Sequence, residues 1–218
     1  IQFVIFAIFA LLILFRFQMA HTDHVVGEHF LLLHTLLEMF SVFVSISIFV
    51  QSWITYATHR IKSQYFIGLV FLAVGCFDLV HTLTYKGMPF IDDEMSATRA
   101  TWFWIIARLI ESIGVALFVF RPNQLLFIKR GWGLSVTVLL VTICTTTILA
   151  IPERLPVLLD EQGVTGLKVS LEYVISTTIF ITFITLLIKY IKDSRPNAES
   201  LRMIFALFIM MIGELFFT

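Results

Sequence analysis

The chain has 218 residues, of which 59% are hydrophobic and only 14% are charged, and its formal net charge is zero. A soluble globular domain is about half apolar and about a quarter charged, so this composition, with a mean hydropathy of +0.95, indicates an integral membrane protein. The sequence contains no basic run and no zinc-finger spacing, which excludes the common nucleic-acid-binding classes.

Seven apolar runs are long enough, or nearly so, to cross a bilayer, and all five prolines fall between them. The sequence therefore predicts an all-α membrane protein, a polytopic bundle of seven unbroken transmembrane helices that forms one integral-membrane domain over residues 1–218. Seven crossings from a cytoplasmic start would leave Thr218 outside, so an eighth helix is expected beyond Thr218 to reach a cytoplasmic partner domain. The predicted spans are Ile1–Met19, Phe30–Ile54, Tyr65–Tyr85, Thr101–Phe120, Gly131–Ile151, Val169–Ile188 and Leu201–Thr218.

Lysine and arginine set the expected orientation of these helices. Basic residues gather in the connections after the second, fourth and sixth runs, as Arg60 and Lys62 illustrate, whereas acidic residues such as Asp92 and Glu153 gather in the alternate connections. Because short basic loops stay in the cytoplasm, we expect a cytoplasmic N-terminus in the cell membrane and acidic loops on the outside.

Ionisable residues inside the apolar runs form the second signal. With a helical rise of ~1.5 Å per residue, five runs place such residues in one layer of the outer half of the bilayer. Charged groups at membrane depth are costly and usually serve a function, so these residues are the candidate ligand or signal-binding site. They are His34, Glu38, Asp78, His81, Arg108, Glu111, Glu172 and Glu214.

The spacing of these residues predicts shared helix faces. Residues three or four positions apart lie on one face of a helix, so inward-facing pairs would build a common site in the core of the bundle. The pairs are His34 with Glu38, Asp78 with His81, and Arg108 with Glu111.

The layer holds five carboxylates against one permanent cation, Arg108, and such crowding favours either protonated acids or a positively charged ligand. Two imidazoles with carboxylates suit iron, zinc or manganese, and a bis-histidine haem is a weaker alternative. A network in which Arg108 bridges the acids without any ligand is the structural alternative. The candidate metal ligands are His34, Glu38, Asp78, His81 and Glu111.

Four short motifs make the chain resemble the third class of membrane-associated sensor domains of bacteria and archaea. The most distinctive is Asp-Leu-x-His-Thr-Leu-x-Tyr-Lys-Gly-Met at Asp78–Met88. The other three are His-x-x-x-Glu-x-x-Ser at His34–Ser41, Ala-Arg-x-x-Glu-Ser at Ala107–Ser112 and Ser-x-Glu-Tyr-x-Ile-Ser at Ser170–Ser176.

The resemblance implies a sensory input domain without enzymatic activity of its own, which acts as a dimer and passes a signal to a cytoplasmic output domain on the same chain. That output domain would be a histidine kinase, a diguanylate cyclase or a PAS-containing regulator. The resemblance supports every candidate residue except Glu214, which rests on depth alone. A membrane-embedded metalloenzyme is the first rival function, and a transporter is the second.

Overall fold

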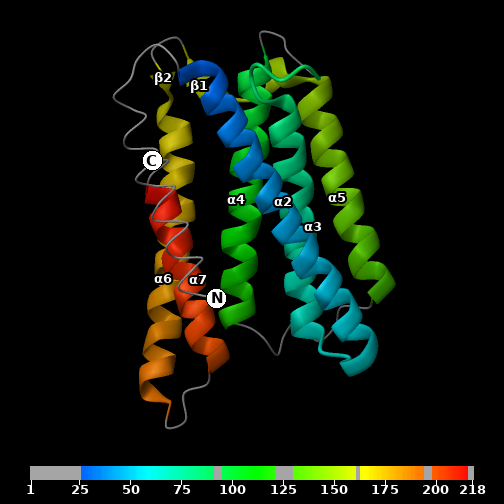
Figure 1. Cartoon of the computed structure of the whole chain (residues 1–218), viewed down its shortest axis with the longest axis vertical. Coiled ribbons are helices and arrows are strands. Elements are labelled where there is room, and N and C mark those ends of the chain that lie inside the picture. The colour runs from blue at the N-terminus through cyan, green and yellow to red at the C-terminus, as the bar shows by residue number, and fades with distance from the viewer. Residues whose placement is uncertain (1–25, 91–94, 121–129, 161–162, 194–197, 216–218) are drawn as a thin grey trace. The chain divides into compact units, whose positions relative to one another are not determined.

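The computed structural model describes residues 26–90, 95–120, 130–160, 163–193 and 198–215. These residues form six α-helices, one short 3-10 helix and one two-stranded antiparallel hairpin (Figure 1). The elements are α2 (Val26–His59), α3 (Lys62–Thr84), α4 (Ser96–Phe120), α5 (Arg130–Ala150), η2 (Pro152–Arg154), β1 (Leu159–Asp160), β2 (Gly163–Val164), α6 (Gly166–Lys192) and α7 (Ala198–Leu215).

Five of the described helices, α2 to α6, are long and apolar enough to cross a membrane. The described part of the chain therefore supports five of the seven expected spans. The first expected span, Ile1–Met19, lies outside the described residues. The seventh forms helix α7 in the expected place, but α7 is not among the five, because Glu199, Arg202 and Glu214 make it more polar.

The chain divides into two compact units, Ile1–Glu38 and Met39–Thr218, and the boundary falls inside α2. In the first unit the described residues form only the start of α2. In the second unit α3 packs against α4 and α5, α4 also packs against α6, and α6 packs against α7 (Figure 1).

Helices α3 and α4 form the interior of the second unit. In the most apolar 18-residue stretch of each helix, 56% of the residues of α3 and 50% of those of α4 are buried, against 6% of those of α5. Phe77 of α3 stacks on Phe103 of α4, with 6.3 Å between ring centroids, and both side chains are buried. Charged side chains on the inner faces of α3 and α4 are therefore shielded from the bilayer and from water.

Glycine allows α2 and α3 to approach closely. A Cβ atom built on Gly68 would lie 2.4 Å from Cβ of Ser52, and one on Gly75 would lie 3.1 Å from Cβ of Ser45. No hydrophobic force drives membrane helices together inside a bilayer, so they pack closely where small residues line the contact. This contact holds the second half of α2 against α3.

The connection between α5 and α6 folds onto the ends of α4 and α6. The sequence did not predict its hairpin, in which Leu159 of β1 pairs with Val164 of β2. Leu158, just before β1, is fully buried against the core residues Ile105 and Ile175. The connection thus ends where α6 begins, at Gly166, two residues before the first charged side chain of that helix, Lys168.

Candidate functional site

Asp78 lies on the buried face of α3, and its side chain is 0% exposed. Nη2 of Arg108, on α4, donates to both carboxylate oxygens of Asp78, at 2.8 Å to Oδ1 and 2.7 Å to Oδ2. Ser41 of α2 donates its hydroxyl to Oδ2 at 3.3 Å. A buried carboxylate is stable when it is paired and hydrogen-bonded, and Asp78 meets both conditions.

Arg108 also forms an ion pair with a residue of its own helix, Glu111. Its Nη1 donates to Oε2 of Glu111 at 2.5 Å, as the three-residue spacing predicted. Because Asp78 and Glu111 each bring one negative charge, the single guanidinium leaves this triad of Asp78, Arg108 and Glu111 with one negative charge in excess when both acids are ionised.

His81 lies one turn after Asp78 and is 5% exposed. Its Nδ1 is 2.7 Å from the backbone carbonyl oxygen of Ala100 at the start of α4. A carbonyl can only accept, so Nδ1 carries the proton and a neutral ring has its lone pair on Nε2. Metal-binding histidines commonly show this arrangement, in which the second ring nitrogen donates to a carbonyl or carboxylate.

Glu172 pairs along its own helix with Lys168, whose Nζ lies 2.5 Å from Oε1. The Glu172 side chain is 1% exposed, and its Oε2 has no hydrogen-bond partner among the described residues. The Lys168 ammonium also lies 5.7 Å from the centroid of the Trp104 ring. Lys168 directly precedes the expected sixth span, Val169–Ile188, and its role was not predicted, although its four-residue spacing to Glu172 was a readable signal.

Glu214 is a buried residue near the end of α7. It lies within electrostatic reach of Arg108, Glu111 and Glu172. The second unit therefore brings four of the predicted carboxylates into one polar layer with two cations, Arg108 and Lys168. If all six groups are ionised, this polar layer has an excess of two negative charges.

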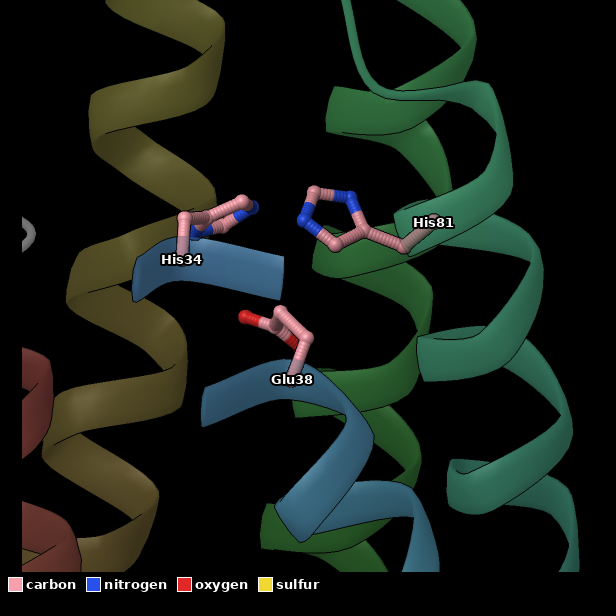
Figure 2. A group of neighbouring side chains, drawn as sticks. All are labelled: His34, Glu38 and His81. Carbon is pink, nitrogen blue, oxygen red and sulfur yellow. The ribbon is translucent and has the colours of Figure 1, made fainter. Parts of the chain in front are cut away.

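His34 and Glu38 belong to the first unit, and His81 belongs to the second. Figure 2 shows the side chains of His34 and Glu38 on α2 and that of His81 on α3. His34 and Glu38 are four residues apart in the continuous helix α2, so they lie on one face of it, as predicted.

Residues 25–218 match the family of membrane-associated sensor domains, which covers the whole described part of the chain. No curated protein and no solved structure matches the sequence. The family match confirms the resemblance seen in the four motifs. A membrane-associated domain also agrees with the five described helices that could cross a membrane. The chain therefore belongs to the family of membrane-associated sensor domains.

Proposed function

We propose that this domain detects a small ligand or a metal ion at its buried polar layer and passes the signal to a cytoplasmic output domain of the same protein. The observation that carries the proposal is the surplus of acidic side chains, with four buried carboxyl groups against two basic residues, Arg108 and Lys168. A purely structural network would be expected to neutralise its charges, whereas a surplus of buried acid favours a positively charged guest.

His81 is the best candidate for a metal ligand in the second unit. Its hydrogen bond to Ala100 directs the lone pair to Nε2, and its burial would keep competing water away. From the sequence, His34 and Glu38 are further candidates for ligands, and imidazoles with carboxylates suit iron, zinc or manganese. Asp78 and Glu111 already accept from Arg108, so in this proposal they hold that cation in place and supply negative charge near the ion.

The signal would leave the site through helix packing. Glu214 of α7 is attracted by Arg108 of α4 and repelled by Glu111 of α4 and Glu172 of α6. A change of charge in the polar layer would therefore favour one packing of these helices over another. We propose that the N-terminus of the chain lies in the cytoplasm and the polar layer in the outer half of the cell membrane. A homodimer joined to a histidine kinase or a diguanylate cyclase would complete the signalling protein.

Elemental analysis and a visible absorption spectrum of the purified protein test the metal proposal. We expect iron, zinc or manganese in the wild-type protein and a clear loss of that metal in His81→Ala. The matched control is His59→Ala, which changes a histidine in the last turn of α2 that is not one of the candidate site residues. Equal metal content in all three proteins would contradict a metal role for His81, and turnover by the metal-loaded domain would favour an enzyme instead.

A further inference from the structure

A groove of about 750 Å³ lies where α5 faces α3 and α4. Its walls are apolar and partly aromatic, and they include Phe66 and Phe77 of α3 and Trp132 and Cys144 of α5. None of the residues of the polar layer lines it. A volume of this size is typical of ligand sites, and this one is distinct from the site proposed above.

The length of the groove matches one leaflet of a bilayer. Its lining runs from Phe66 to Phe77 on α3 and from Trp132 to Cys144 on α5, so both helices enter it from the same end. At a rise of ~1.5 Å per residue these stretches are about 17 Å long, close to half of a hydrocarbon core of ~30 Å. A chain that extends from one membrane surface to the middle of the bilayer would fill the groove.

The end of the groove where α3 and α5 begin is basic. Leu134 of α5 packs against the cluster of Tyr56, Tyr65 and Leu69, which places the start of α5 beside the link between α2 and α3. Arg60 lies in that link, and Lys62 is the first residue of α3. Lysine and arginine at a membrane surface attract anionic headgroups, each by about 1 kcal/mol.

We propose that this groove binds one acyl chain of an anionic phospholipid, whose headgroup lies at Arg60 and Lys62. The shape and the apolar lining of the groove select the chain, and the two basic side chains select the headgroup. At its deep end the groove reaches Phe77, the residue before Asp78. The bound chain would therefore pack against the turn of α3 that carries the ion pair with Arg108.

Native mass spectrometry in detergent tests the choice of headgroup. The protein is titrated with phosphatidylglycerol and with phosphatidylcholine that carry identical acyl chains. We expect tighter binding of phosphatidylglycerol, and Arg60→Gln or Lys62→Gln should each weaken it about fivefold, the factor that corresponds to ~1 kcal/mol. Lys192→Gln, at the end of α6, is the matched control and should leave binding unchanged. Equal affinities for the two lipids in the wild-type protein would overturn the proposal.

A second pair of variants tests the groove itself. Thr137 lines the groove, whereas the next residue, Val138, does not line it and is 51% exposed. Thr137→Phe should reduce binding of both lipids at least as much as the loss of one basic residue, and Val138→Phe should not reduce it. Circular dichroism and gel filtration confirm that both variants are folded. Equal effects of the two substitutions would overturn the groove as the binding site.

Photo-crosslinking locates the chain without any substitution. A phosphatidylglycerol with a diazirine at the end of one acyl chain should label Val141 and Cys144, which line the deep part of the groove. The same helix offers an internal control in Ile143, which is 52% exposed but lies outside the groove. Labelling of Ile143 equal to that of Val141 and Cys144 would show ordinary contact with bulk lipid and would overturn the proposal.

Discussion

Arg108 of α4 pairs with a charged side chain of another helix, Asp78 of α3, whereas the charged pair on α6 lies within a single helix. Arg108 reaches across to Asp78 from another helix, while Lys168 reaches Glu172 one turn further along α6. The first pair exists only when α3 and α4 are docked in register. The second needs only the helix itself. One pair therefore reports on the tertiary fold and the other on local structure.

The two pairs also differ in what removal of the cation leaves behind. Without Arg108, two carboxylates from two helices would lose their cation, and Asp78 is fully buried. Without Lys168, only Glu172 would lose one. Breaking a buried pair costs about 3–5 kcal/mol, whereas a pair four residues apart on an exposed helix contributes only about 0.3–0.5 kcal/mol. We expect the α6 pair to fall between these values, because Glu172 is buried but Lys168 is partly exposed.

The largest effect is expected from Arg108→Gln. Loss of the guanidinium leaves Asp78 and Glu111 without their shared cation, so the free energy of unfolding should fall by about 3–5 kcal/mol. Reversible unfolding in mixed micelles measures this change. The matched control is Arg154→Gln on the exposed side of η2, which should change stability by less than about 0.5 kcal/mol. Equal losses in both variants would refute the bridging role of Arg108.

A second substitution tests the packing that positions α3. Gly68→Ala would bring a methyl group into Ser52 of α2, and overpacking of this kind costs about 1–3 kcal/mol. The double variant Gly68→Ala with Ser52→Gly should recover most of that loss, because the clashing atoms are then absent. Gly131→Ala is the control, since nothing lies within 4 Å of its added Cβ. Failure of the double variant to recover stability would show that the α2–α3 contact does not limit the fold.

The smallest effect is expected from the pair on α6. A double-mutant cycle with Lys168→Gln and Glu172→Gln isolates its coupling energy, which should be about 1 kcal/mol. The same cycle for Arg108→Gln and Asp78→Asn should give a larger value, because that pair is more deeply buried and links two helices. Equal coupling energies would remove the distinction between the two pairs.

Much of the helical pattern could be predicted from the sequence, because length and hydropathy define membrane spans. Helices α2 to α6 begin and end within five residues of the expected bounds, and α7 begins within three residues of its expected start. Hydropathy does not identify which helices form the interior, however. The most apolar windows of α3 and α5 have the same hydropathy of 2.0, yet 56% of one and 6% of the other is buried. In a bilayer the lipid-facing and inward-facing surfaces are both apolar, so their composition does not separate them.

The candidate site could also be predicted only in part. Spacing along one helix indicated that Arg108 and Glu111 would interact, and the structure pairs them. Depth estimates also placed Asp78 and Arg108 in one layer, but they could not assign the two hydrogen bonds between them. The role of Lys168 was missed because the expected sixth span began one residue after it, at Val169, whereas α6 begins at Gly166.

The most direct test of the sensor account measures, in cells, the output of the signalling protein proposed above, at equal amounts of protein in the membrane. We predict that His81→Ala and Asp78→Asn abolish the response while both variants still insert, and that Asp193→Asn, at the exposed end of α6, responds like the wild type. A normal response in the His81 and Asp78 variants, or loss of their insertion in place of their response, would contradict the account and would favour a purely structural network.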